Sequence, residues 1–441
     1  MKQMKLTKYS TLCFQSNNEF SHWVGYYTIC PISADGKKML VHRSRFDGRD
    51  ISQNDSIEVG WIDLFSEKYD FHRVDSTVAF NWQQGANLQW VGDDCLIYNI
   101  VSNDKYASRI YHIDTGDYKD IDSPIYIADG PNLFSLDYER LYWCRAYHYC
   151  QIIVNEKNKK IVEKDGIYKT DLKKNKKELL VTIDSIIKID PDDDFGELKH
   201  WLEHLVFNAD KTKIAFFHRY ELKDGTYKTR IFTMNTDGTE LSIIPGWRDG
   251  YYTHLNWWNN NLIVCFTVRS GKLKSKIISQ NKKESQNDRD QNNSKGRRDI
   301  KRIIINVYRK FFVKFIPDRI RNKYFNHKRY VVYDIKKGFI NEFDNYNLYV
   351  DGHPSFTKDG QYMLTDTYAD KHGFRNLMIY DIKKNKIYKI GSFYSPFNAC
   401  PYRSDLHPRF SRDEKYVVVD SAHSGRHQVV VIKINWDKIR K

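Results

Sequence analysis

The sequence has no long hydrophobic run, and no stretch approaches the roughly 18 apolar residues that a membrane-spanning helix needs. Its opening residues, MKQMKLTKYS, lack the apolar core of a signal peptide. The seven cysteines are odd in number and have no CxxC spacing, so they indicate neither a disulfide framework nor a zinc ribbon. We therefore expect a cytoplasmic protein whose cysteines are reduced.

Aromatic side chains, in contrast, are abundant. The 441 residues are 41% hydrophobic and 15% aromatic, with 31 Tyr, 24 Phe and 10 Trp. A chain of this length and composition can bury a large core, which excludes a disordered protein. Aromatic rings suit the half-buried surface of a β-sheet, so the composition favours β-structure over a helical bundle.

The positive charge is confined to one segment. Of the formal net charge of +15, residues 271–330 carry +14, with 19 Lys and Arg against 5 Asp and Glu. We interpret 271–330 as an insert that begins with a polar loop at 279–299. Residues 301–323 follow with apolar side chains at helical spacing and basic ones opposite, which predicts a basic amphipathic helix.

Such a helix has more than one use. It can lie on an anionic membrane surface, dock on a protein partner, or pack its apolar face on its own domain. Nucleic-acid binding is the least favoured reading, because the rest of the chain is nearly neutral. Membrane docking would place the protein at the periphery of the inner membrane.

Outside the insert, a short pattern recurs seven times: an apolar or His start, a polar turn and a β-rich run. The copies lie at 30–43, 88–99, 133–145, 204–219, 254–269, 353–368 and 407–423. A second β-rich run follows each copy, and the unit measures roughly 54 residues. We therefore predict an all-β fold, a seven-bladed β-propeller spanning 1–441 as one domain. Six or eight blades remain compatible, because copies two and three are the weakest.

Four copies open with histidine at the same register: His204, His254, His353 and His407. Equivalent positions of successive blades are related by rotation, so these side chains should surround one mouth of the channel. Converging neutral imidazoles are suited to binding Mn, Fe or Zn, and Asp405 should project beside His407. The alternative is that each histidine only hydrogen-bonds a neighbouring blade.

Other polar residues gather near the starts of blades. Gln83 and Gln84 lie in FNWQQGANLQW (80–90), a composition suited to sugar stacking and hydroxyl recognition, and Arg45 follows the first inner run. The glutamines can equally belong to a loop between blades that satisfies its own backbone.

The motifs DGHPSFTKDGQYMLTDTY, SDLHPRFSRDEKYVVVDSAHSGRHQ and HLVFNADKTKIAFFHR resemble the oligogalacturonate lyase family and related ulvan-lyase-like propellers. The turns between strands also resemble those of TolB-like propellers. The specific motifs are confined to 204–219 and 353–428. The resemblance implies a cytoplasmic seven-bladed propeller that binds a manganese-type divalent ion and cleaves uronate-containing oligosaccharides by β-elimination.

Carried onto this sequence, the resemblance makes His353 and His407 metal ligands. Asp405 stands where the family has a further ligand histidine, and the family's glutamine falls near Tyr402. For the chemistry, we take His204 as the candidate base, with Arg219 or Tyr252 assisting. Arg45, Gln83, Gln84 and His254 are the candidate substrate-binding residues.

A second function remains open. The chain can be a propeller without catalytic activity that binds glycans or proteins in surface polysaccharide assembly, docked to the membrane by its basic helix. A fold of this kind hosts many unrelated functions and does not decide between the two.

Overall fold

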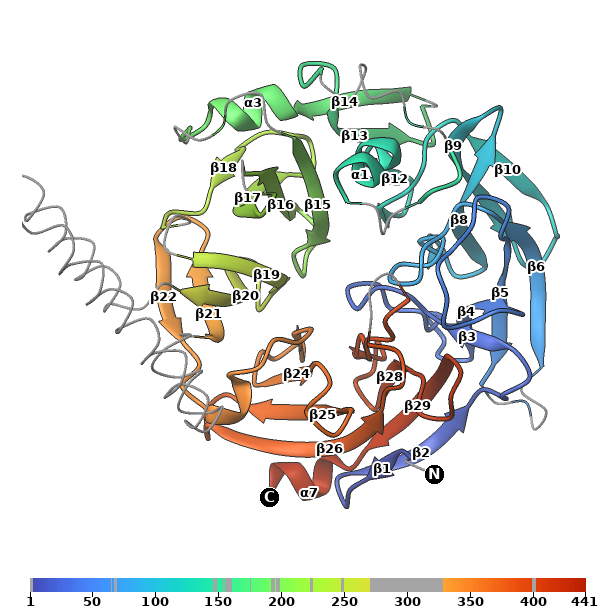
Figure 1. Cartoon of the computed structure of the whole chain (residues 1–441), viewed down its shortest axis with the longest axis vertical. Coiled ribbons are helices and arrows are strands. Elements are labelled where there is room, and N and C mark those ends of the chain that lie inside the picture. The colour runs from blue at the N-terminus through green and yellow to red at the C-terminus, as the bar shows by residue number, and fades with distance from the viewer. Residues whose placement is uncertain are drawn as a thin grey trace, which may run out of the picture.

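The computed structural model describes residues 3–64, 66, 70–145, 149–152, 154, 161–174, 176–191, 195, 199–222, 225–246, 250–269, 328–398 and 402–441. Seven antiparallel sheets are arranged around a central axis, which confirms the predicted seven-bladed β-propeller (Figure 1). The inner run of each repeat predicts a separate blade correctly, because strand periodicity and turn residues are local signals.

Blades 1 to 4 follow one another along the chain. Blade 1 contains β3 (Ser21–Trp23), β4 (Lys38–Ser44), β5 (Ile57–Asp63) and β6 (Phe71–Thr77). Blade 2 contains β7 (Gln89–Trp90), β8 (Cys95–Ser102), β9 (Lys105–His112) and β10 (Tyr118–Ile121). Blade 3 contains β11 (Ile127–Asp129), β12 (Asn132–Ser135), β13 (Gly166–Asp171) and β14 (Lys176–Thr182). Blade 4 contains β15 (His200–Phe207), β16 (Lys213–Glu221), β17 (Tyr227–Asn235) and β18 (Ser242–Ile243).

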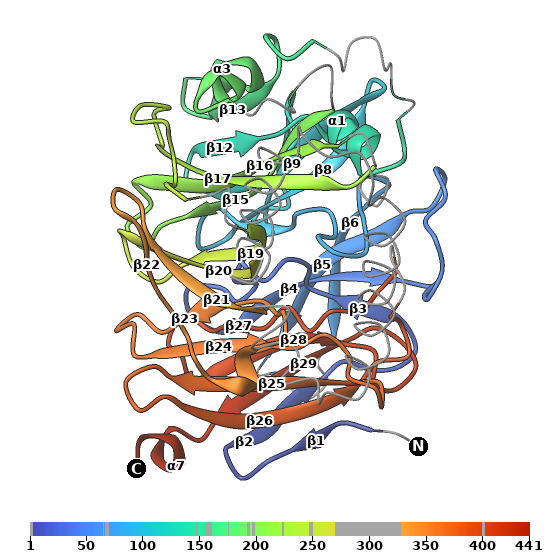
Figure 2. The same ribbon diagram turned by 60° about the vertical axis from the view of Figure 1, so that its left-hand side comes forward.

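The N-terminal strands complete the last two blades. Blade 5 contains β19 (Gly250–Trp257), β20 (Leu262–Arg269), β21 (Lys328–Asp334) and β22 (Gly338–Glu342). Blade 6 contains β23 (Ser355–Phe356), β24 (Tyr362–Asp366), β25 (Phe374–Asp381) and β26 (Lys386–Tyr394), and β1 (Lys5–Leu6) pairs with β26. Blade 7 contains β27 (Arg409–Phe410), β28 (Tyr416–Ser421) and β29 (Gln428–Ile434), with β2 (Ser10–Gln15) as its outer strand. Both ends of the chain therefore close the ring (Figure 2).

Helices are few and short in the described part of the chain: α1 (Tyr138–Cys144), α3 (Ile183–Lys188), the 3-10 helix η3 (Tyr346–Leu348) and α7 (Trp436–Arg440). Helix α1 corrects the third repeat, where we predicted a β-rich run. Asp137 caps the N-terminus of α1 by accepting a hydrogen bond from the backbone N–H of Arg140. None of these helices is long and apolar enough to cross a bilayer.

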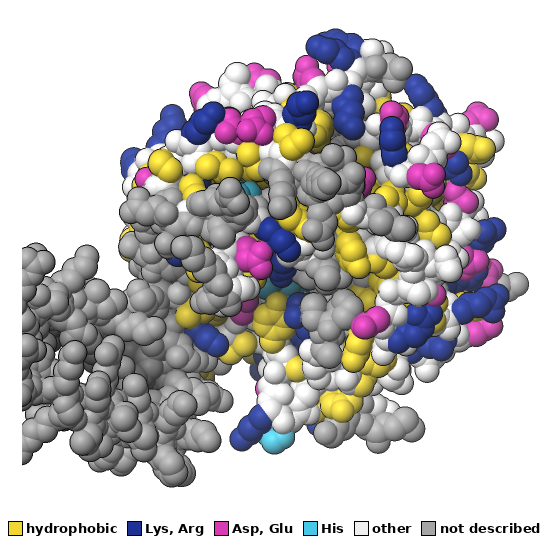
Figure 3. Space-filling view, turned by 45° about the horizontal axis from the view of Figure 1, so that its top comes forward, with side chains coloured by type: hydrophobic (Ala, Val, Ile, Leu, Met, Phe, Trp, Pro, Cys, Tyr) yellow, Lys and Arg dark blue, Asp and Glu magenta, His cyan; other side chains and the backbone are white. Residues whose placement is uncertain are grey.

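The predicted insert interrupts blade 5 between β20 and β21. Its basic helix at 301–323 lies outside the described residues. Residues 328–330, which we assigned to the end of the insert, begin β21 instead. The face of the propeller in Figure 3 shows basic and acidic side chains interspersed, as expected for a body with nearly balanced charge.

Candidate functional site

A cavity of about 350 Å³ lies on the propeller axis. Side chains from six of the seven blades and from the connections between them reach it. Its wall is formed by Tyr26, Gln83, Gln84, Arg145, His204, Arg219, Tyr227, Tyr251, Thr253, His254, Asp351, His353, Tyr368, Arg403 and His407. All four histidines selected from their shared register therefore line one cavity.

The backbone explains how the histidines reach the axis. His204, His254 and His407 have positive φ angles of 60°, 40° and 43°. The ladders of β15 and β19 shift register at His204 and His254, so each of these residues lies in a β-bulge. A bulge releases one residue from the ladder and redirects its side chain, here toward the channel.

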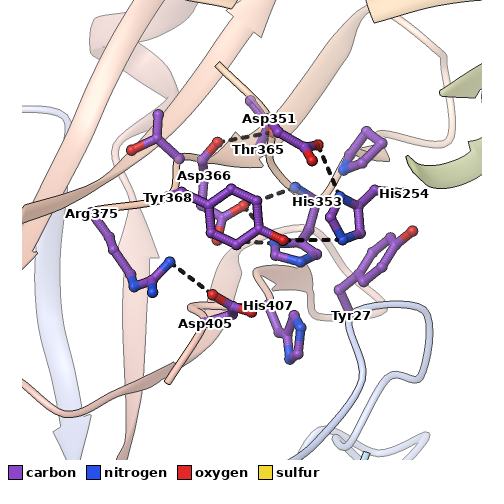
Figure 4. Close-up of polar contacts among 12 residues, drawn as sticks. Tyr27, His254, Asp351, His353, Thr365, Asp366, Tyr368, Arg375, Asp405 and His407 are labelled. Carbon is purple, nitrogen blue, oxygen red and sulfur yellow. Dashed lines mark hydrogen bonds and ion pairs between the residues drawn. The ribbon is translucent and has the colours of Figure 1, made fainter. Parts of the chain in front are cut away.

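Three of the imidazoles form a compact row. The ring centroid of His353 lies 4.3 Å from that of His254 and 4.4 Å from that of His407 (Figure 4). His204 is farther away, 6.3 Å from His254. His353 and His407 are almost completely buried, at 1% and 3% exposure.

One nitrogen of each ring in this row is held by an acceptor. His407 Nδ1 lies 3.0 Å from the Gly25 carbonyl oxygen, and His353 Nδ1 lies 2.9 Å from Asp366 Oδ1. His254 Nδ1 lies 2.9 Å from Asp351 Oδ1. A carbonyl or an ionised carboxylate only accepts, so Nδ1 carries the proton and Nε2 keeps its lone pair. This is the arrangement found in histidines that bind metals.

Burial keeps three of the four cavity imidazoles neutral. Desolvation lowers the pKa of His204, His353 and His407 well below the usual value. Burial also raises the pKa of Asp366 to about 6, so this carboxyl is ionised at neutral pH and accepts from His353. The cavity therefore presents unprotonated imidazole nitrogens at pH 7.

Asp405 completes a candidate metal site with His353 and His407. One potential ligand atom from each of these three residues lies within 4.8 Å of the other two. Asp405 is also paired with Arg375 and Arg403, each at 2.7 Å. Burial alone would raise the pKa of the Asp405 carboxyl, but the two guanidinium groups lower it below its usual value. Imidazole nitrogens with a carboxylate suit a manganese-type divalent ion, so the donor set fits the expected cofactor.

The opposite wall carries Arg219, which we selected from the sequence. Arg219 forms a close ion pair with the buried carboxylate of Glu203, and Arg145 lies 3.5 Å from the same carboxylate. The guanidinium groups of both arginines lie over the ring of Tyr227. Glu203 also approaches His204 Nδ1 to 3.6 Å. One side of the cavity therefore holds the candidate base His204, the two guanidinium groups and the carboxylate of Glu203.

Tyr252 is not brought to this cavity. Its ring is fully buried between strands, and its hydroxyl lies 2.9 Å from that of Tyr333. Successive strand residues point to opposite faces, so Tyr251 occupies the cavity wall instead. Arg45 is exposed, 5.1 Å from the centre of the Phe20 ring, and does not line the cavity either.

Gln83 and Gln84 do reach the cavity, but their side-chain amides also form hydrogen bonds within the protein. Gln83 Nε2 donates to the Arg403 carbonyl at 2.6 Å, and Gln84 Nε2 donates to the Tyr126 hydroxyl at 3.0 Å. These bonds tie the loop at the rim to other segments of the chain, whereas the alternative interpretation of the sequence expected a loop that satisfies its own backbone.

Several cavity residues were missed from the sequence. Asp351 is one of them, Tyr368, Arg403 and Arg145 lack a repeated position, and Tyr26 belongs to a connection between strands. Asp351 had a detectable signal, since it precedes His353 by two residues just as Asp405 precedes His407. The others are brought in by tertiary contacts alone.

The fold and cavity define this protein as a seven-bladed β-propeller with an axial histidine cluster. Neither a protein-family model nor a curated protein sequence matches the chain. Among solved structures, it is similar to an oligogalacturonate lyase in complex with manganese, with a TM-score of 0.58 and 14% identity over 100% of both chains. It is also similar to the oligogalacturonate lyase of Vibrio parahaemolyticus, with a TM-score of 0.58 and 13% identity over 98% of this chain and 96% of the other. These similarities show the shared fold.

Proposed function

We propose that this protein binds acidic oligosaccharides in the axial cavity and cleaves them by metal-assisted β-elimination at a uronate residue. The observation that carries this proposal is the pair of buried imidazoles of His353 and His407, whose Nδ1 atoms are fixed, beside Asp405. The similarity to oligogalacturonate lyases, one of them in complex with manganese, supports the same reading.

His353, His407 and Asp405 would hold a manganese-type divalent ion. When bound, such an ion acts as a Lewis acid toward the uronate carboxylate and makes the adjacent C–H more acidic. Arg145, Arg219 and Arg403 line the same cavity and can bind the carboxylates of an acidic sugar chain.

His204 suits the role of base. Its ring is neutral at pH 7 because burial lowers its pKa, so it can accept a proton. The carboxylate of Glu203, 3.6 Å away, would stabilise the imidazolium that forms. Tyr251 replaces Tyr252 as the candidate proton donor, since burial raises its pKa and keeps the hydroxyl protonated.

One observation favours the second candidate function, a propeller that binds glycans or proteins without cleaving them. Asp405 is engaged by Arg375 and Arg403, so part of its charge is already neutralised. We extend the proposal to the whole chain: a cytoplasmic protein that 301–323 brings to an anionic membrane surface or to a protein partner in surface polysaccharide assembly.

Metal analysis of the purified protein, together with the absorbance of unsaturated uronate products, tests the proposal. A panel of acidic oligosaccharides serves as substrates. We expect bound manganese and product formation in the native protein and neither in His353→Ala/His407→Ala. His72→Ala/His112→Ala, which removes two histidines outside the cavity, is the matched control and should behave as the native protein. Bound metal without product would favour the binding function, and absence of both would refute metal-assisted elimination.

A further inference from the structure

A segment of four residues, Val24 to Tyr27, lies against the histidines of the cavity. The Tyr26 ring lies 5.3 Å from the rings of both His204 and His407. The Tyr27 ring lies 5.0 Å from that of His353, and its hydroxyl donates to the Leu255 carbonyl at 2.7 Å. Tyr26 lines the histidine cavity, whereas Tyr27 lines a second cavity of about 510 Å³. We call residues 24–27 the crossing segment, because it separates these two cavities.

Blade 7 holds the crossing segment in place. Asp420, on β28, accepts hydrogen bonds from the backbone N–H groups of Val24 at 2.7 Å and Gly25 at 3.1 Å. Arg409 Nη2 donates to the Gly25 carbonyl and lies 3.3 Å from Asp420 Oδ2. Asp420 and Arg409 are both almost completely buried, so these contacts are shielded from water.

The Gly25 carbonyl is also the acceptor for His407 Nδ1, at 3.0 Å. Two donors, the guanidinium of Arg409 and the imidazole of His407, thus converge on one oxygen atom. The carbonyl can have this orientation because Gly25 adopts a φ of +109°, and a Cβ there would lie 2.7 Å from the Gln84 carbonyl oxygen.

We infer that Asp420 and Arg409 are positioning residues for the ion site, acting through the Gly25 carbonyl on the ring of His407. They fix the backbone of the crossing segment, the carbonyl fixes the Nδ1–H tautomer, and Nε2 of His407 is left to bind a divalent ion. The inference rests on the proposed function for its ion, and it concerns residues that do not touch the ion.

This arrangement links the site to closure of the ring. The crossing segment follows directly after β3 of blade 1, and β2, which precedes β3, is the outer strand of blade 7. Asp420, Arg409 and His407 belong to the same blade 7. The same N-terminal stretch of chain therefore completes blade 7 and supplies the acceptor for His407.

The test compares Asp420→Asn with Asp381→Asn in the full chain. Asp381 is an equally buried carboxylate at the end of β25, where it accepts from the backbone N–H of Lys384. Manganese affinity is measured by calorimetric titration and Tm by differential scanning calorimetry. We expect Asp420→Asn to weaken manganese binding by about 10- to 100-fold, the usual cost of losing an outer-shell partner. Asp381→Asn should lower Tm to a similar extent and leave the affinity unchanged. Equal affinities in the two variants would overturn the inference.

A second measurement separates this inference from the proposed function. The protein is labelled with 15N-histidine, and the His407 signals are assigned by comparison with His407→Ala. We expect the Nδ1–H tautomer in the native protein and its loss or mixture in Asp420→Asn. If the native protein binds no manganese, the proposed metal function fails, and this spectrum still decides the positioning role. An unchanged tautomer in Asp420→Asn would overturn it.

Discussion

Blades 4 to 7 and blades 1 to 3 enclose the same cavity but supply different chemistry. Each blade from 4 to 7 contributes a histidine from the start of its repeat: His204, His254, His353 or His407. From the described part of the first three blades and their connections come Tyr26, Gln83, Gln84 and Arg145. The repeated positions thus build the candidate ion site, and the non-repeated connections build its floor and rim.

This difference teaches where sequence patterns carry function in a propeller. A repeated residue is placed by rotation, so four copies meet on the axis without further adjustment. A connection between strands has no such constraint, and its contribution depends on how far it reaches into the channel. The two halves should therefore respond differently to substitution, although they should unfold together.

The largest effect we expect is acid unfolding of the whole propeller, blades 1 to 3 together with blades 4 to 7. Burial lowers the pKa of His22 and His42 in blade 1 and of His200 in blade 4 to about 4. In the unfolded chain these three histidines bind protons below pH ~6.5, whereas in the folded chain they do so only near pH 4, so stability falls as pH decreases from about 6.5 to 4. At pH 4, each of these histidines has lowered the free energy of unfolding by on the order of 3 kcal/mol. The raised pKa of Asp366 acts in the opposite direction, but it is one group against at least three.

Circular dichroism and tryptophan fluorescence, recorded together from pH 7 to 4, measure this loss. Because the ring is closed, the two signals should change in a single transition. Full stability at pH 4.5, or two separated transitions, would contradict the expectation that the halves unfold as one unit.

The next largest effect concerns Gly25, which belongs to the crossing segment that blade 1 contributes to the floor of the cavity. Gly25→Ala places a Cβ 2.7 Å from the Gln84 carbonyl oxygen at a φ of +109°. We expect a loss of unfolding free energy of at least about 2 kcal/mol in urea titrations. Gly36→Ala is the control, since its φ is +76° but no atom lies within 4 Å of the added Cβ. A smaller loss at position 25 than at position 36 would show that the crossing segment is not tightly fixed.

Within the second half, neighbouring tyrosines should have opposite effects. Tyr251→Phe removes from the cavity a hydroxyl that donates to the Tyr227 hydroxyl, and should weaken oligosaccharide binding several-fold while costing about 1 kcal/mol of stability at most. Tyr252→Phe removes hydrogen bonds to Gly246 and Tyr333 and should cost about 1 kcal/mol of stability, with unchanged binding. Binding calorimetry and urea unfolding of both variants check this pair. The reverse pattern would restore Tyr252 to the site.

The smallest effect should come from the rim of blade 1. Arg45 is exposed and does not line the cavity, so Arg45→Ala should leave oligosaccharide affinity and Tm close to the native values. A clear loss of affinity would mean that the binding surface extends from the axis to blade 1.

The sequence-based predictions succeeded for the repeat register and failed for local detail, for a physical reason. The blade number and the convergence of His204, His254, His353 and His407 followed from periodicity, because strands and turns are encoded locally. Tyr252 was misplaced by one residue, since strand alternation decides which of two adjacent tyrosines faces the channel. Helix α1 was missed, because its cap at Asp137 resembles a turn signal.

The sequence by itself determined the repeated architecture and the register of its histidines, since both depend on residue spacing along the chain. Only the tertiary structure decided what surrounds each ring. Gly25 and His407 are 382 residues apart, and they meet because ring closure brings the N-terminal strands to blade 7. Arg375 likewise reaches the cluster from strand β25, at a position that no repeat marks. Burial and neighbouring charges then set the protonation of His353, His407 and Asp405, because both depend on neighbours in space and not in sequence.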